Sequence, residues 1–326
     1  MSNIYTSVTQ LVGRTPLLEF VNIEKNNDLK GKILGKLEYF NPTGSIKDRA
    51  VLNILEKAEV EGRLKPGATV VETTSGNTGI AIAAFCASKG YKSIIYLEPG
   101  VTPERVQIMK AYGTDVRSIN EIPGAAEILA EFGFDPVRLM SSVRAHCDEH
   151  GYFYVDQTFN ENNPLAHYNT TGPEIFEDTD GNVDIAVMLV GTGGTFAGVA
   201  SYLQEKIPGV QIVGVQPTPD SLSFVPDAKA TIDGVVIFDV NGTTHHPFIT
   251  RRNLKYDEVL TVSGETAYEV AKEAATTEGI LLGASAAAAL AAAKEVAARP
   301  ENEGKNIVVI LADNGMKYLS TNMYKY

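Results

Sequence analysis

The sequence predicts an α/β fold with doubly wound, mostly parallel sheets. Five short runs rich in Val and Ile recur along the chain, at residues 68–72, 92–98, 184–190, 211–217 and 306–313. Continuous apolar runs of this length are typical of parallel strands that are covered on both faces. Segments with helical periodicity lie between the runs and predict the crossover helices of such sheets.

Length and composition predict two soluble domains. At about 150 residues per domain, the 326 residues correspond to about two domains, and the content of 44% apolar and 21% charged residues is that of a folded globular protein. No internal repeat or polar linker separates the halves, and we place a boundary near residue 150.

Net charge and cysteine content indicate which binding partners and which cellular compartment to expect. The chain has 28 Lys and Arg against 40 Asp and Glu, a formal charge of −12, which repels nucleic acids and anionic membranes. Cys86 and Cys147 are too few for a disulfide framework, and the first ten residues lack the features of a secretory signal. No apolar stretch has the eighteen or so residues of a membrane span. We therefore expect a cytoplasmic protein.

A lysine stands at the start of a predicted helix. In the segment from Asn41 to Arg49, Ser45 and Asp48 fit a capping box, so we expect a helix to begin at Ser45. Lys47 then lies in the first turn, where the helix dipole and any burial favour a neutral amine. A neutral amine can form a Schiff base with a carbonyl group. The alternative is a solvated lysine with no chemical role.

Two strands lead into glycine-rich turns that open helices. The run at 68–72 continues into residues 73–79 (TTSGNTG), and the run at 184–190 continues into residues 191–195 (GTGGT). Free backbone N–H groups at such turns bind anions, and we expect one turn to hold a phosphate and the other a carboxylate. Phe196 replaces the third glycine of a dinucleotide-binding motif, and no P-loop lysine follows, so neither NAD nor ATP is indicated. The alternative is a pair of tight turns without a ligand.

Three further segments are predicted from local signals. Thr102, Pro103 and Gly113 mark the start and stop of a helix over 102–113. Regular patterning fades between about 218 and 258, which predicts a functional loop region. The alanine-rich stretch at 284–298 predicts a closely packed core helix.

Six segments in this order resemble the cysteine synthase and cystathionine β-synthase family of pyridoxal-phosphate (PLP) enzymes. They are GRTPLLEF, NPTGSIKDR, TSGNTGIAIA, VGTGGTFAGV, EGILLGASAAAA and VVILADNGMKYLST, and the resemblance covers nearly the whole chain. It implies the two-domain fold-type II architecture, similar to the tryptophan synthase β subunit. Residues 1–40 and 151–326 would form the large PLP-binding domain, and residues 41–150 a smaller, mobile domain with the loop for the substrate carboxylate.

The resemblance also assigns roles to individual residues. Lys47 would hold PLP as the internal aldimine and act as acid and base at the substrate Cα. Asn77 would bond the phenolic oxygen of the cofactor, and Ser285 would face its pyridine nitrogen. The cofactor phosphate would bind to Gly191, Thr192, Gly193, Gly194 and Thr195. The substrate would bind, mainly through its carboxylate, to Thr74, Ser75, Asn77, Thr78 and Gln157.

The implied reaction is β-elimination through an aminoacrylate, followed by β-addition, on a serine- or cysteine-type amino acid. Because a serine hydroxyl does not hold a proton on the pyridine nitrogen, the ring is a weaker electron sink, which suits this chemistry. We expect the carboxylate turn to close on the substrate as a lid and a homodimer to form, both from the resemblance alone.

Departures from cysteine synthase leave the second half-reaction open. Thr158 stands where the family has an aromatic residue, and residues 232–239 (IDGVVIFD) replace an expected G-x-G-A-G stretch. Asp233 in this stretch could activate water or repel sulfide, which favours release of hydrogen sulfide from cysteine with formation of serine. Residues 163–171 are more similar to cystathionine β-synthase, so thioether synthesis is a further alternative. For Asp233 itself, the alternative is a solvated loop carboxylate without a catalytic role.

The remaining candidates have a simpler interpretation. His146 and His150 are spaced for a zinc pair on a helix, but no third ligand is evident, and we expect a solvated helix end rather than a metal site. We expect His245 and His246 to lie on a loop surface. A catalytically silent, peptide-binding scaffold is the alternative from outside the enzymes, and the intact Lys47 and glycine turns speak against it.

Overall fold

The computed structural model describes residues 4–74, 76–97, 101–132, 136–223, 225, 228–244 and 246–325. The chain divides into two compact units. The small unit comprises Met1–Val12 and Lys47–Asn162, and the large unit comprises Gly13–Ile46 and Asn163–Tyr326. The predicted division at 1–40, 41–150 and 151–326, with a mobile smaller domain, stays a prediction. Within the described ranges, every helix is too short or too polar to cross a membrane.

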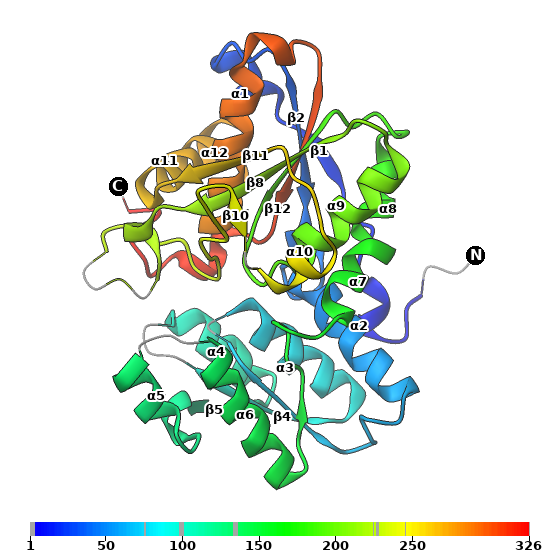
Figure 1. Ribbon diagram of the computed structural model, residues 1–326, viewed down its shortest axis with the longest axis vertical. Coiled ribbons are helices and arrows are strands. Elements are labelled where there is room, and N and C mark those ends of the chain that lie inside the picture. The colour runs from blue at the N-terminus through cyan, green and yellow to red at the C-terminus, as the bar shows by residue number, and fades with distance from the viewer. Residues whose placement is uncertain are drawn as a thin grey trace. The chain divides into compact units, whose positions relative to one another are not determined.

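The large unit is built on a six-stranded sheet (Figure 1). Five of its strands are parallel, and β1 pairs antiparallel with β2 at one edge. The predicted strands near 184–190, 211–217 and 306–313 are confirmed as β7, β8 and β12. In spatial order the strands are β1 (Leu17–Glu19), β2 (Lys32–Leu37), β12 (Asn306–Leu311), β7 (Ile185–Leu189), β8 (Gln211–Pro217) and β11 (Glu258–Val262).

Helices cover both faces of this sheet (Figure 1). One face packs against α1 (Val21–Asn26), α11 (Gly264–Thr277) and α12 (Ala284–Ala298), and the other against α8 (Thr171–Asp178), α9 (Gly194–Lys206) and α10 (Pro247–Arg251). The alanine-rich α12 is buried along most of its length, so the predicted core helix is confirmed. Its methyl side chains let the helix backbone approach the strands closely.

The small unit has a four-stranded parallel sheet covered in the same way. Successive residues of a strand point to opposite faces. Val70 accordingly packs with α2 (Lys47–Val60) and α3 (Asn77–Lys89), and Val71 with α5 (Ala125–Phe132) and α6 (Pro136–His150). The strand order is β5 (Asp115–Ser118), β4 (Lys92–Leu97), β3 (Thr69–Thr73) and β6 (Phe153–Tyr154), which confirms the predicted strands near 68–72 and 92–98.

The predicted helix boundaries differ in accuracy. Helix α4 (Pro103–Ala111) has Thr102 as its N-cap and is followed by Gly113 with φ +88°, as expected. The predicted start of α2 at Ser45 is wrong, because the helix begins at Lys47. Ser45 instead forms an antiparallel bridge with Asp313, and the next amide, Ile46 N, donates to the Ala312 carbonyl at 2.9 Å. Backbone pairing with the end of β12 therefore replaces the predicted cap.

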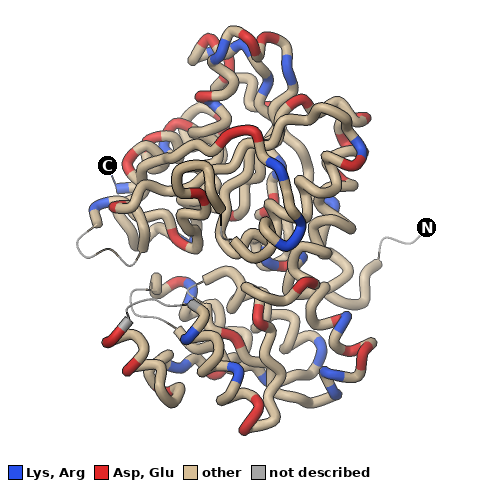
Figure 2. The backbone as a smooth tube through the Cα atoms, in the orientation of Figure 1, with Lys and Arg blue, Asp and Glu red and all other residues tan. Residues whose placement is uncertain are grey.

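Short elements complete the described chain. Where the structure describes the segment between 218 and 258, it contains only short helices and strands, in agreement with its irregular pattern. The short elements of the whole described chain that have not yet been named are η1 (Val8–Leu11), η2 (Glu38–Phe40), η3 (Ile119–Glu121), α7 (Asn162–Asn169), η4 (Pro219–Ser221), β9 (Asp239–Val240), β10 (Thr243–Thr244), η5 (Pro300–Asn302) and η6 (Gly315–Tyr318). Figure 2 shows basic and acidic residues interspersed along the chain in both units.

Candidate active site

The predicted carboxylate turn lies between β3 and α3 in the small unit. The Thr74 amide donates to the Tyr96 carbonyl at 3.2 Å, which fixes the start of the turn on the neighbouring strand β4. The Gly76 amide donates to Thr74 Oγ1 at 3.3 Å. Helix α3 begins at Asn77, and the first amides of a helix have no partner within it. The turn thus presents donors at the positive end of a helix, whereas Ser75 lies outside the described residues.

Two predicted carboxylate-binding residues contact each other although they lie far apart in sequence. Thr78 Oγ1 donates to Gln157 Oε1 at 2.7 Å. Because its oxygen accepts this bond, the Gln157 amide has a defined orientation, with its NH₂ group as the remaining donor. This geometry suits recognition of a carboxylate, and the substrate-binding roles of these residues stay predictions.

The second glycine-rich turn, in the large unit, is closely packed. Gly193 has φ +73°, and α9 begins at Gly194. A Cβ atom at Gly193 would lie 2.4 Å from the His246 ring, and one at Gly194 would lie 2.0 Å from Asn163 Oδ1. Only glycine fits at these two positions. The amides of the turn lie at the positive end of α9, where backbone N–H groups favour an anion.

Two side chains of α7 orient the threonines of this turn. Asn163 Nδ2 donates to Thr192 Oγ1 at 3.0 Å. The His167 ring lies between two hydroxyls, with Nε2 3.2 Å from Thr195 Oγ1 and Nδ1 2.9 Å from Thr171 Oγ1. Sequence reasoning missed the contributions of Asn163 and His167, although the segment 163–171 was singled out for its similarity to cystathionine β-synthase.

His246 contradicts the prediction of a loop surface. Its ring is half-buried against the glycine-rich turn, and Nε2 donates to the Gly191 carbonyl at 3.1 Å. Burial lowers the pKa of His246, although the bond to Gly191 acts in the opposite direction. The prediction was wrong because a histidine in an irregular segment carries no local signal of what it packs against. His245 lies outside the described residues.

Ser285 is the second residue of α12, and Gly283 is the N-cap of this helix. The Ser285 side chain is half-buried, and in the described ranges no hydrogen bond joins it to another residue. The hydroxyl can therefore donate to an acceptor such as a pyridine nitrogen. This role stays a prediction.

Lys47 is the first residue of α2 and is half-buried. The loop before it is held from within the large unit by the buried side chain of Lys317, whose Nζ donates to the carbonyls of Thr43 at 3.1 Å and Gly44 at 3.2 Å. The main chain that leads to Lys47 is thereby restrained. A restrained approach is suited to a residue that must hold a cofactor in a defined position.

Asp233 belongs to a segment that packs directly on the glycine-rich turn. The Val236 amide donates to the Val190 carbonyl at 3.0 Å. The Gly234 carbonyl lies only 2.3 Å from the place that a Cβ atom of Gly191 would occupy. Asp233 is half-buried, and Thr231 Oγ1 donates to its Oδ1 at 3.4 Å. The segment that replaces the expected glycine-rich stretch therefore adjoins the turn.

The other reactive side chains have structural partners. His146 Nε2 lies 3.0 Å from Tyr96 Oη, and His150 Nδ1 donates to the His146 carbonyl at 2.9 Å. The part of the chain that the structure describes holds no group of three His, Cys, Asp or Glu side chains that could bind a metal ion. Cys86 and Cys147 are buried, and burial raises the pKa of each thiol to about 12, so neither is a thiolate at neutral pH.

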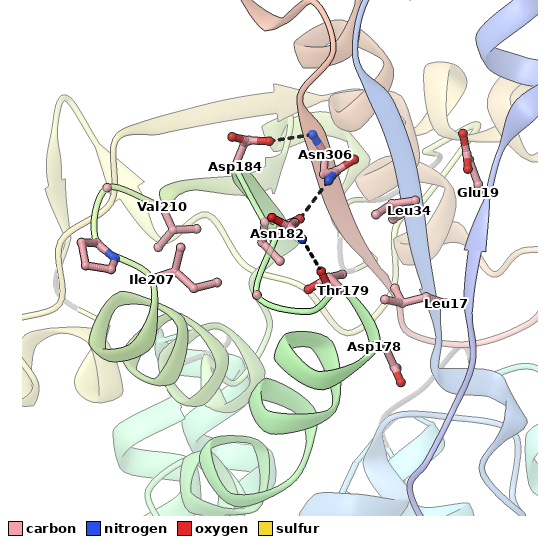
Figure 3. A pocket seen from close by; sticks show the side chains of 14 residues that line it. Leu17, Glu19, Leu34, Asp178, Thr179, Asn182, Asp184, Ile207, Val210 and Asn306 are labelled. Carbon is pink, nitrogen blue, oxygen red and sulfur yellow. Dashed lines mark hydrogen bonds between the residues drawn. The ribbon is translucent and has the colours of Figure 1, made fainter.

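A surface pocket in the large unit lies away from the predicted site. Its volume is about 610 Å³, and it is found at the amino ends of β7 and β12 (Figure 3). Asp184 Oδ2 accepts from the Asn306 amide at 2.8 Å, and the Asn306 side chain donates to the Asn182 carbonyl at 3.0 Å. These bonds join the strand ends. Ligands of α/β sheets bind at the carboxyl ends, where β7 meets the glycine-rich turn.

Comparison with known proteins identifies the family. The sequence profile described as "Pyridoxal-phosphate dependent enzyme" matches residues 8–313. The chain belongs to this family. It is 36% identical over 323 residues to a cysteine synthase of Staphylococcus aureus, a match that covers 98% of this chain and 97% of that protein. The predicted family, its PLP dependence and its cofactor are confirmed.

Solved structures agree with this assignment. An O-acetylserine-dependent cystathionine β-synthase from Helicobacter pylori superposes with a TM-score of 0.84 at 30% identity, over 99% of this chain and 100% of that one. A hydrogen sulfide-producing enzyme from Fusobacterium nucleatum superposes with a TM-score of 0.77 at 34% identity, over 97% and 100%. The predicted fold-type II architecture and the predicted class of reaction, β-replacement or β-elimination, are confirmed.

The residues of this chain fit the cofactor. Gly193 and Gly194 allow the turn to pack closely against His246 and Asn163, and its amides lie at the positive end of a thirteen-residue helix, where anions bind. The Ser285 hydroxyl, at the start of another helix, is available to an aromatic nitrogen. Both observations match what PLP requires of a protein.

Proposed function

We propose that this enzyme carries out β-replacement or β-elimination on a serine- or cysteine-type amino acid, as a cysteine synthase does. The observation that supports this most is that Lys47 and the two glycine-rich turns each stand at the N-terminus of a helix. Lys47 begins α2, the carboxylate turn begins α3, and the phosphate turn begins α9. The relatives reported above support the same reaction class.

The cofactor, when bound, withdraws electrons from the substrate Cα and so makes its proton removable. In our proposal the turn from Gly191 to Thr195 binds its phosphate, and Lys47 holds its aldehyde carbon. Asn77 donates to its phenolic oxygen. The Lys47 amine would take the Cα proton of the amino acid and later return one. The neutral Ser285 hydroxyl would donate to the pyridine nitrogen without supplying it a full proton, which would favour elimination over transamination.

The substrate is held by its carboxylate in the small unit. The donors are the Thr74 hydroxyl, Ser75, Asn77, the Thr78 backbone amide and the Gln157 NH₂ group, because the single proton of the Thr78 hydroxyl goes to Gln157 Oε1. A bound carboxylate fixes the amino acid so that the Cα–H bond can be presented to Lys47. Closure of the turn over the substrate would exclude water from the reacting atoms.

Release of hydrogen sulfide from cysteine is a second candidate. It is favoured by Asp233, which lies in the segment packed on Gly191, and by similarity to the hydrogen sulfide-producing enzyme of Fusobacterium nucleatum. In this version the Cβ–S bond of cysteine breaks and sulfide leaves, the Asp233 carboxylate takes a proton from water as the water oxygen bonds to Cβ, and Lys47 returns a proton to Cα, which gives serine. Its negative charge disfavours hydrosulfide as the nucleophile.

The test is product analysis with serine, cysteine and O-acetylserine, each with and without sulfide. Cysteine formed from O-acetylserine and sulfide supports synthesis, whereas sulfide and serine formed from cysteine alone support the second candidate. A thioether product indicates a cystathionine synthase. D233N should lose formation of serine but keep loss of sulfide from cysteine, and equal turnover in both proteins removes Asp233 from the mechanism.

The cofactor itself gives the most direct check. The purified enzyme should show the visible absorption band of a protonated Schiff base of PLP, and K47A should not. Wild-type protein without this band, even after addition of PLP, would contradict the proposal. A band that no amino acid changes, together with tight peptide binding, would indicate the scaffold alternative. We further propose a cytoplasmic homodimer, for which size-exclusion chromatography with light scattering tests the dimer.

A further inference from the structure

Glu72 is a buried carboxyl at the end of β3 that the proposed reaction does not use. Its side chain is only 1% exposed. Oε1 accepts from the Thr73 amide at 2.8 Å, and Oε2 accepts from the Gln157 amide at 3.0 Å. The Glu72 side chain therefore links β3, which leads into the carboxylate turn, to Gln157, whose side chain contacts Thr78 next to this turn.

Glu72 lies where the backbone pairing between β3 and β6 ends, so a side chain is needed there to connect the two segments. Strands β3 and β6 pair through Val70 with Phe153 and Val71 with Tyr154, and the last bond between them runs from the Val155 amide to the Val71 carbonyl. Beyond it, the two chains no longer form a ladder. At the next residue, the Glu72 carboxyl replaces the backbone ladder and connects the end of β3 to Gln157.

The same two segments are joined a second time on the side of the turn. The Thr78 hydroxyl donates to the Gln157 side chain at 2.7 Å, while Glu72 holds the Gln157 main chain. Gln157 is thus fixed by its backbone and by its side chain. Any change at Glu72 moves the Gln157 amide relative to Thr78, and both are proposed donors to the substrate.

We infer that Glu72 is a positioning residue of the amino-acid carboxylate site, and that the affinity for the amino acid falls when Glu72 becomes charged. The inference rests on the proposed function, because it takes Thr78 and Gln157 as carboxylate donors. A negative charge one residue before the turn opposes a second carboxylate bound in it, since Coulomb interactions are strong in a buried environment.

The surroundings of Glu72 determine the pH at which its carboxyl becomes charged. Burial raises the pKa of the Glu72 carboxyl to about 8, and the two amide bonds lower it only in part. Asp156 also raises it through charge repulsion, although Arg144 Nη2 bonds Asp156 Oδ2 at 2.5 Å. The Tyr154 phenol and the Cys147 thiol face the same carboxyl, and their pKa values are raised, so both are neutral at pH 8. Glu72 is therefore the group that ionises near pH 8.

The experiment compares wild type with E72Q as PLP-loaded enzymes. L-serine binding is measured from the change in cofactor absorption between pH 6.5 and 9.5, together with KM and kcat. The glutamine NH₂ group cannot accept a backbone amide, so E72Q loses one of the two bonds and should bind serine about fivefold to tenfold more weakly at pH 7. Its kcat should change by less than about twofold. The ratio of the two dissociation constants should approach one above pH 8, because only the wild type gains a charge.

Two more variants complete the design. D156N removes the neighbouring charge but keeps both Glu72 bonds, and asparagine tolerates the φ of +55° at this position. It should move the fall in affinity to lower pH. E24Q is the control: Glu24 of α1 is a half-buried carboxyl that accepts from the Ile33 amide at 2.6 Å and whose pKa is raised by burial, and its replacement should leave serine affinity and its pH dependence unchanged.

The outcomes separate the inference from the function on which it rests. Wild-type enzyme that binds serine, while E72Q and D156N match it in affinity at every pH, overturns the inference and leaves the function intact. If E72Q does not fold, the shift or absence of a shift in D156N decides. A wild-type enzyme whose cofactor responds to no amino acid overturns the proposed function, and the inference with it.

Discussion

At the scale of single residues, the second glycine-rich turn shows how tightly a proposed binding turn can be packed. Gly193 and Gly194 are needed because the His246 ring and the Asn163 amide occupy the space that side chains would fill. These glycines therefore have a packing function as well as the proposed ligand function. The two functions can be separated by removing the neighbour instead of the glycine.

We expect G194A to lose affinity for PLP and about 1–3 kcal/mol of unfolding free energy, because its Cβ atom would lie 2.0 Å from Asn163 Oδ1. Equilibrium urea unfolding of the apoenzyme and titration with PLP measure the two effects. The double variant N163A/G194A relieves the overlap and should recover part of the stability. If it is no more stable than G194A, the Asn163 contact is not the cause.

Residues also show what sequence reasoning can and cannot reach. Lys47 and the two glycine turns can be proposed from the sequence because their chemistry depends on short local patterns, and their roles stay predictions. His246 was misjudged because its partner Gly191 lies 55 positions away. Glu72 had a weak signal, since it is the one charged residue of an otherwise apolar strand and directly precedes the turn. A charge at such a place could have been examined for a buried partner.

At the scale of elements, α12 illustrates how composition determines packing. Its buried alanines contact the strands of the large sheet over several turns, and the helix carries Ser285 at its start. A larger side chain in this interface would force the helix away from the sheet. The displacement would reach Ser285, because a helix moves as a rigid element.

We expect A289L to cost about 1–3 kcal/mol of unfolding free energy, since Ala289 is fully buried and three added carbons find no space. A298L, at the exposed end of the same helix, is the matched control and should change stability by less than about 0.5 kcal/mol. Urea unfolding of the three proteins tests this. Equal losses in both variants would show that the interface is not tightly packed.

Elements were predicted well where a pattern persists over many residues. Runs of Val and Ile identified β3, β4, β7, β8 and β12. Parallel strands that are covered on both faces bury successive side chains, so their residues are apolar in continuous runs. The start of α2 was misplaced by two residues because Ser45 and Ile46 pair with the end of β12. No local pattern reveals a partner so distant in sequence.

At the scale of the whole molecule, the charge of Glu72 couples folding to pH. In unfolded chains a glutamate ionises near pH 4.5, whereas in the folded protein burial raises its pKa to about 8. Between these values the folded state holds one more proton than the unfolded state, so stability falls as pH rises from about 4.5 to about 8. Above pH 8 both states are ionised and the contribution levels off.

The prediction concerns the difference between wild type and E72Q. The unfolding free energy of E72Q should lack this decline, so its value relative to wild type should increase between pH 5 and pH 8 and then stay constant. Urea unfolding of the apoenzymes at pH 5, 6.5 and 8 measures it. A constant difference over this range would mean that Glu72 has the same pKa in both states.

The course of the chain through the two units has a consequence for biosynthesis. Most of the small unit, Lys47–Asn162, is inserted between two segments of the large unit, and in the large sheet Lys32 of β2 lies opposite Asn306 of β12. A growing polypeptide has therefore made every strand of the small sheet long before the ribosome supplies β12. Until then β2 can pair with β1 on one side only, and its other edge is open to aggregation and to chaperones.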